Sequence, residues 1–141
     1  MMKRNIYSHL LKWKSSETRK PLILKGARQV GKTHILKHFG EKEYENVIYF
    51  NFERDPALFD FFKGRIEPQK ILEKLAIYSE RKINPNTTLL IFDEIQASPN
   101  ALKSLKYFNE ECTEYHIAAA GSLLGVKLGQ ATAFPVGKVN F

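Results

Sequence analysis

The chain has 141 residues, of which 43% are hydrophobic and 26% charged, and its formal net charge is +7. This length can bury about two thirds of the unfolded surface in one core, and the hydrophobic fraction and ten Phe favour a folded rather than a disordered chain. Cys112 is the single cysteine, which excludes an intramolecular disulfide and favours a reducing compartment. Neither a signal-peptide stretch nor a run of about 18 apolar residues occurs, so we expect a cytoplasmic protein without a membrane span.

The amino-terminal segment carries all of the net charge. Residues 1–28 contain eight Lys or Arg against Glu17, whereas the remainder contains fourteen residues of each sign. Ile6, Leu10 and Trp13 recur at helical spacing, which predicts that residues 1–20 form a basic amphipathic helix packed on the core. The basic face could be a solvated surface or could contact nucleic-acid phosphates, and we favour the solvated surface. Residues 21–141 are expected to form the core of the same domain.

The octapeptide GARQVGKT at residues 26–33 follows the apolar run 22–24 and precedes a predicted helix at 33–39. It matches the pattern GxxxxGK(S/T) in its required strand, loop and helix context. Glycines at both ends allow successive N–H groups to turn inward around a phosphate, and the helix N-terminus adds donors and partial positive charge. Lys32 is expected to reach the β- and γ-phosphates, and the Thr33 hydroxyl to be a ligand of Mg²⁺. The residues expected to contact the nucleotide here are Gly26, Ala27, Arg28, Gln29, Val30, Gly31, Lys32, Thr33 and His34.

The alternative interpretation of this octapeptide is a tight glycine turn with an exposed lysine. A chance match to the pattern in so short a chain is of the order of one in a hundred, so we favour phosphate binding. His34 and His38 lie four residues apart on the predicted helix and could share a metal, but no third ligand is obvious. Surface or packing roles are therefore favoured for both histidines.

A second strand is predicted at 46–52 and a helix at 68–81, where Ile71, Leu75 and Tyr78 share one stripe. The sequence LLIFDE then occupies residues 89–94, and its continuous apolar run is typical of a strand buried on both faces of a parallel sheet. Ligands bind outside the carboxyl ends of such strands. Asp93 is therefore expected beside the glycine loop as a Mg²⁺ ligand, and Glu94 could orient or deprotonate an attacking water.

The two carboxylates could instead simply end a strand and enter a turn, but beside a phosphate loop we favour the metal and base roles. Ser98 and Pro99 predict the start of a helix at 99–112, whose apolar stripe makes Cys112 a core residue. A further strand is predicted at 117–120, and it is followed by Gly121 and Ser122.

Five segments occur in this order: RKPLILKGARQVGKT, NFERDP, LLIFDEIQ, AAAGSLLG and FPVGKV. Together they resemble the AAA_14-type ATPases of bacteria and archaea, within the AAA+ and STAND-like branch, over nearly the whole chain. The resemblance implies an α/β fold of three layers, with a mainly parallel sheet of strand order 5-1-4-3-2 and helices on both faces. It implies ATP and Mg²⁺ as ligands and places Ser122 at the sensor 1 position, although a capping role is an equal alternative. Asn51 could pair with Glu94, but a turn role is favoured.

AAA_14-type proteins are commonly followed by a DUF4143 domain, so the resemblance implies that the chain ends before a lid and a second domain. Arginine occurs at positions 4, 19, 28, 54, 65 and 81, and residues 82–141 contain none. An arginine that stabilises the transferring phosphoryl group is worth about 10³ to 10⁵ in rate. We therefore expect MgATP binding with slow hydrolysis, unless a partner domain or a neighbouring subunit of a homo-oligomer supplies an arginine.

Three other functions are less favoured. The first is a regulatory module that binds nucleotide without turnover. The second is a small-molecule kinase, which usually brings arginines in a lid that the carboxyl-terminal half lacks. The third is a GTPase, but no (N/T)KxD guanine-reading motif is present. The predicted function is therefore a MgATP-binding ATPase domain.

Overall fold

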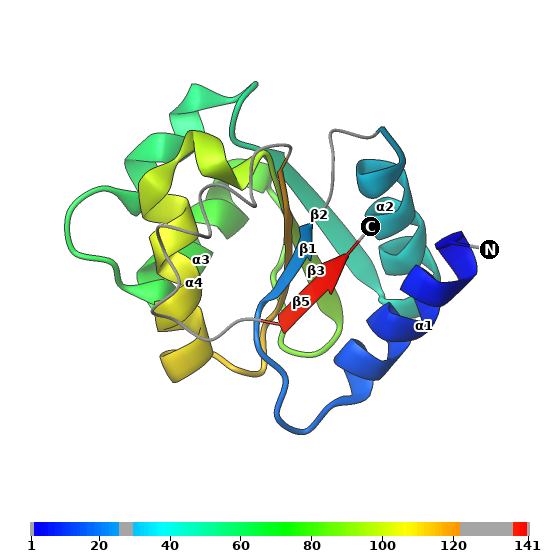
Figure 1. The fold of residues 1–141 in the computed structure, drawn as a ribbon. Helices are drawn as coiled ribbons and strands as arrows, with labels where there is room; N and C mark the ends of the chain where they lie inside the picture. The colour runs from blue at the N-terminus through cyan, green and yellow to red at the C-terminus, as the bar shows by residue number, and fades with distance from the viewer. Residues whose placement is uncertain (1, 26–29, 122–136, 141) are drawn as a thin grey trace.

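The computed structural model describes the backbone of residues 2–25, 30–121 and 137–140, and the side chains of residues 5–24 and 31–121 (Figure 1). The amino-terminal half contains α1 (Met2–Ser15), β1 (Leu22–Lys25), α2 (Val30–Glu43), β2 (Asn46–Asn51), the 3₁₀ helix η1 (Pro56–Phe62) and α3 (Pro68–Ser79). The carboxyl-terminal half contains β3 (Thr88–Asp93), the 3₁₀ helix η2 (Ile95–Ala97), α4 (Pro99–Glu111), β4 (His116–Ala120) and β5 (Gly137–Asn140).

The five strands form one sheet with the order β2-β3-β4-β1-β5, and every neighbouring pair is parallel. Counted from the opposite edge, this is the order 5-1-4-3-2, so the expected fold class is confirmed. Every residue of β3 and of β4 is buried. Central strands of a parallel sheet are covered on both faces, which explains why LLIF and IAAA are continuous apolar runs rather than alternating ones.

Helices cover both faces of the sheet (Figure 1). On one face, η1, α3 and α4 bury a cluster that includes Phe52, Phe62, Phe92 and Phe108. On the other face, α1 and α2 bury a second cluster that includes Leu24, Leu36 and Ile91. The sheet therefore separates two apolar cores, as expected for a three-layer α/β architecture.

Helix α1 is docked on the sheet through its apolar stripe. Ile6, Leu10 and Trp13 are all buried, as their spacing predicted. The Trp13 indole Nε1 donates to the Lys20 carbonyl at 2.6 Å, and its ring packs edge-on against His116 with centroids 5.7 Å apart. These contacts join the helix, the connection that follows it and the start of β4.

His116 is a buried polar residue at that junction, and it is held by two hydrogen bonds. Its Nε2 lies 3.2 Å from Asn86 Oδ1, which can only accept, so Nε2 carries the proton and Nδ1 accepts from the Tyr44 hydroxyl at 2.6 Å. Burial lowers the pKa of His116 to about 4, and the positive charges of Arg19 and Lys14 act in the same direction. The ring is therefore neutral at physiological pH.

Several element boundaries differ from those expected. The helix after the glycine loop runs from Val30 to Glu43 rather than over 33–39. The helix expected at 68–81 ends at Ser79 because Glu80 takes a left-handed conformation with φ of 56°. The strand expected at 46–52 ends at Asn51, whose Oδ1 accepts from the backbone N–H groups of Glu53 and Arg54 and starts a turn.

Helix α4 begins as the sequence predicts. The Ser98 Oγ accepts from the Ala101 N–H at 3.2 Å and Pro99 occupies the first helical position. Cys112 lies just after the last helical residue and is buried, which confirms its expected core role.

Candidate functional site

The candidate site lies at the carboxyl edge of the sheet, where β1, β3 and β4 end. Lys32 and Thr33 lie in the first turn of α2, Asp93 ends β3, and Gly121 follows β4. Strands β1 and β4 pair Leu24 with Ala120, so their ends are level. The parallel register therefore brings residues that are far apart in the sequence to one edge, as ligand sites in open α/β sheets require.

The carboxylate of Asp93 is the centre of this arrangement. Its Oδ2 accepts from the Thr33 hydroxyl at 2.7 Å and from the Tyr49 hydroxyl at 2.5 Å, and its Oδ1 accepts from the Glu94 N–H at 2.9 Å. The residue is 6% exposed. Hydrogen bonds to carboxylates are about twice as strong as neutral ones, so three donors hold this side chain in one orientation.

Tyr49 is a site residue that the sequence reasoning missed. Register pairs Tyr49 with Ile91 and Asn51 with Asp93, which places the Tyr49 hydroxyl within reach of the carboxylate. Burial raises the pKa of Tyr49 to about 12, with further contributions from the hydrogen bond to Asp93 and from its charge. The phenol therefore stays protonated and donates to Asp93 throughout the physiological range, while the Lys37 ammonium lies 4.0 Å from its ring centroid.

Asn51 takes the turn role that the sequence favoured. Its Nδ2 donates to the Tyr49 hydroxyl at 3.1 Å, and its Oδ1 accepts two backbone N–H groups of the following turn. Both ends of the amide are thus engaged at the end of β2.

Lys32 is buried, with 4% of the residue exposed, and its Nζ donates to the Gly121 carbonyl at 3.1 Å. The side chain therefore points inward rather than into solvent. Burial lowers the pKa of Lys32, and the negative charges of Glu94 and Asp93 oppose this shift. The exposed lysine of the alternative interpretation is therefore wrong. An ammonium group lies beside two carboxylates at the end of the sheet, which suits the binding of a magnesium-bound phosphate chain.

Glu94 directly follows β3 and has φ of 50° and ψ of 44°, the left-handed region that non-glycine residues seldom adopt. Such a conformation costs about 1–3 kcal/mol and concentrates at functional sites. Here it ends the strand and begins η2, and the Glu94 Oε1 accepts from Gln96 Nε2 at 2.8 Å. The backbone therefore turns sharply directly after Asp93.

The structure describes only part of the predicted site. Gly26, Ala27, Arg28, Gln29 and Ser122 lie outside the described residues, and for Val30 only the backbone at the start of α2 is described. His34 is exposed, and its ring stacks on that of His38 with centroids 6.4 Å apart. Within residues 5–24 and 31–121, no group of three His, Cys, Asp or Glu side chains could hold a metal on its own.

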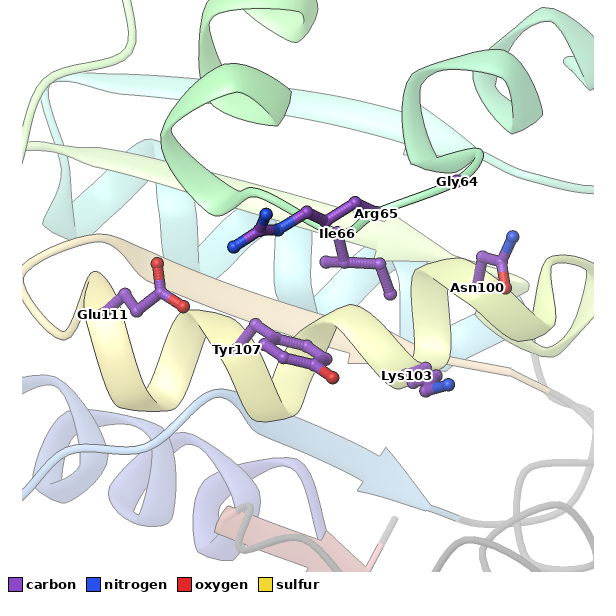
Figure 2. Close-up of a pocket in the computed structure, with 7 residues that line it drawn as sticks. All are labelled: Gly64, Arg65, Ile66, Asn100, Lys103, Tyr107 and Glu111. Atoms are coloured by element: carbon purple, nitrogen blue, oxygen red, sulfur yellow. The ribbon is translucent and has the colours of Figure 1, made fainter.

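A separate pocket of about 360 Å³ lies between the loop before α3 and the exposed side of α4 (Figure 2). Its lining residues are Gly64, Arg65, Ile66, Asn100, Lys103, Tyr107 and Glu111. None of the predicted nucleotide-binding residues lines it, so it is distinct from the candidate site.

Among the helices that the structure describes, none combines the length and hydrophobicity that a membrane span requires.

Comparison with solved structures agrees with this fold. Among solved structures, the chain is similar to a Walker-type ATPase of Pyrococcus abyssi, with 16% identity and a TM-score of 0.54, over 98% of this chain and 51% of that one. It is also similar to PCH-2 of C. elegans, with 17% identity and a TM-score of 0.55, over 99% of this chain and 41% of that one. The chain thus spans about half the length of these structures or less, and the likeness concerns the fold. No curated protein matches the sequence.

The family comparison covers most of the chain. A family model described as an AAA domain matches residues 18–141, from the loop before β1 to the last residue. The match includes the glycine loop, Asp93 at the end of β3, Glu94 directly after it and the segment after β4, so the chain belongs to the AAA_14 family of AAA domains.

Proposed function

We propose that this chain binds ATP with Mg²⁺ and hydrolyses it to ADP and phosphate. The observation that carries the proposal is the direct hydrogen bond of 2.7 Å between Thr33 and Asp93, which joins the phosphate-loop helix to the strand that ends in Asp93. Lys32 from the same helix and Glu94, the residue directly after β3, complete the set. Membership of the AAA_14 family supports the same function.

The residues present fit a magnesium ion. Mg²⁺ takes oxygen ligands and is usually held by one or two protein oxygens together with substrate phosphates, rather than by a cage of side chains. Thr33 and Asp93 supply a hydroxyl and a carboxylate in contact, and we propose that these two residues hold the ion. When bound, Mg²⁺ would neutralise charge on the phosphate oxygens.

The reaction assigned to this site is the transfer of the γ-phosphoryl group to water. The water oxygen forms a bond to the γ-phosphorus while the bond to the β–γ bridging oxygen breaks, and the bridging oxygen keeps the electron pair as ADP leaves. Glu94 orients the water and accepts its proton. Lys32 binds the β- and γ-phosphate oxygens, and its burial increases the strength of that electrostatic contact.

The remaining predicted residues have supporting roles in this proposal. The backbone of residues 26–31 surrounds the phosphates, His34 lies one helical step further, and Ser122 contacts the γ-phosphate or the water. Helix α1 belongs to the same domain as residues 21–141 and could cover the adenine. Because residues 82–141 contain no arginine, we propose that ATP turnover is slow until an arginine comes from elsewhere. A neighbouring subunit or a further domain, such as a DUF4143-like one, would supply this arginine.

The same lack of arginine in residues 82–141 favours one alternative, a module that binds nucleotide and reports its presence without turnover. Single-turnover hydrolysis of radiolabelled ATP, with the chain in excess over the nucleotide, distinguishes the ATPase from the binding module. For the ATPase, Glu94→Gln should lower the rate by about 10²-fold or more. Glu110→Gln, on the exposed side of α4, is the matched control and should hydrolyse like the wild type. Equal rates for wild type and Glu94→Gln would leave only the binding module.

A further inference from the structure

The side chain of Gln96 bridges the turn after β3 and the end of β4. It lies in η2, two residues after Glu94, and its Nε2 donates to Glu94 Oε1 at 2.8 Å. A carboxylate oxygen can only accept from an amide, so this contact also fixes which end of the Gln96 amide is nitrogen and which is oxygen.

The other end of the amide lies against Gly121. A Cβ placed on Gly121 would come within 1.9 Å of Gln96 Oε1 and 3.0 Å of its Cδ, so only glycine leaves room for the carboxamide here. The Gln96 Oε1 is buried and has no hydrogen-bond partner among the described residues. The carboxamide oxygen therefore packs against Gly121, where a side chain larger than that of glycine would displace it.

The same Gly121 residue also contacts Lys32, because its carbonyl accepts from Lys32 Nζ. A continuous set of contacts thus runs from Lys32 through Gly121 and Gln96 to Glu94. It connects the residue proposed to bind phosphate with the residue proposed to accept the proton of water.

From these contacts we infer that Gln96 is a positioning residue that holds the Glu94 carboxylate in its working orientation and requires glycine at position 121. The inference rests on the proposed ATPase function. Glu94 has several rotatable bonds and follows a sharp turn, and the hydrogen bond from Gln96 restricts the positions that its carboxylate can take. A carboxylate can accept at both oxygens, so a hydrogen bond at Oε1 does not use up its capacity to accept a proton from water.

The test combines kinetics with a readout that does not depend on turnover. Gln96→Met keeps the length of the side chain and removes the donor, and it should lower the single-turnover rate about tenfold to a hundredfold, because a misplacement near 1 Å can cost that much. The Kd for MgATP should change by less than about twofold. Gln69→Met, the same change at an exposed position on α3, is the matched control and should change neither quantity.

A purely structural role of Gln96 is excluded by combining the variants. If Gln96 acts through Glu94, then adding Gln96→Met to Glu94→Gln should lower the rate by less than about twofold further, because residues that act as a unit are not additive. An additive loss in the double variant, or an unchanged rate for Gln96→Met, would overturn the inference and leave the ATPase function standing.

Nuclear magnetic resonance tests the contact itself. The side-chain NH₂ signals of Gln96 can be assigned by their loss in Gln96→Met. Their exchange with water should be roughly tenfold or more slower than that of an exposed glutamine, and should become fast in Glu94→Ala. Fast exchange in the wild type would overturn the inference even if the chain hydrolyses ATP. Slow exchange together with a wild type that neither binds nor hydrolyses ATP would contradict the proposed function and confirm the positioning contact.

Discussion

Acidification should destabilise this domain through His116, and the size of the effect follows from its surroundings. The folded state keeps the ring neutral down to a pKa of about 4, whereas the unfolded chain protonates it near the ordinary value of 6.5. Between these values the unfolded chain binds one more proton, so stability is fully present above about pH 6.5 and is lost as the pH falls towards 4. The expected loss between about pH 7 and about pH 5 is roughly 2 kcal/mol.

Urea unfolding followed by tryptophan fluorescence measures this loss directly, because Trp13 is the single tryptophan and its ring packs against His116. His116→Gln is the control, since glutamine does not titrate and all other ionisable groups remain. The free energy of unfolding of the wild type should fall by about 2 kcal/mol more than that of the variant over this pH range. Equal losses in the two proteins would refute the conclusion that His116 is buried and neutral.

Three further substitutions test particular contacts in the structure by urea unfolding. Gly121→Ala should cost about 1–3 kcal/mol of stability, because the new methyl group overlaps the Gln96 side chain, and most of this cost should disappear when Gln96→Ala is added; a stable Gly121→Ala variant would contradict the close contact. Tyr49→Phe should cost about 1–2 kcal/mol, because it removes the hydroxyl that donates to Asp93, and a neutral change would show that this hydrogen bond does not form. Trp13→Ala should cost about 3–5 kcal/mol if α1 is docked on the sheet, whereas a loss below about 1 kcal/mol would mean that the helix is detached.

The parts of the site that sequence predicts are those encoded by contiguous patterns. Lys32 and Thr33 follow from the glycine loop, and Asp93 and Glu94 follow from the apolar run before them. Each pattern also predicts the strand or helix around it, so it places these residues at the start of a helix or at the end of a strand. The strand order came from the resemblance to a family, because local patterns do not specify which strands are neighbours.

The contacts that sequence could not predict depend on register between strands. Tyr49 reaches Asp93 only because β2 and β3 pair residue by residue, and Gln96 reaches Gly121 only because β3 and β4 end at the same edge. A tyrosine near the end of a strand that adjoins the carboxylate strand is a signal that could have been used. The helix end at Ser79 was missed because a glutamate, rather than a glycine, adopts the left-handed capping conformation.

The central claim is that the first turn of α2 and the end of β3 form a binding site for MgATP. Calorimetric titration of MgATP into the wild type and into Lys32→Ala tests it most directly, with Lys42→Ala, an exposed lysine in the last turn of the same helix, as the matched control. We expect micromolar binding to the wild type and to Lys42→Ala, and the loss of that binding in Lys32→Ala. A folded wild-type chain that does not bind MgATP, or equal binding by all three proteins, would contradict it.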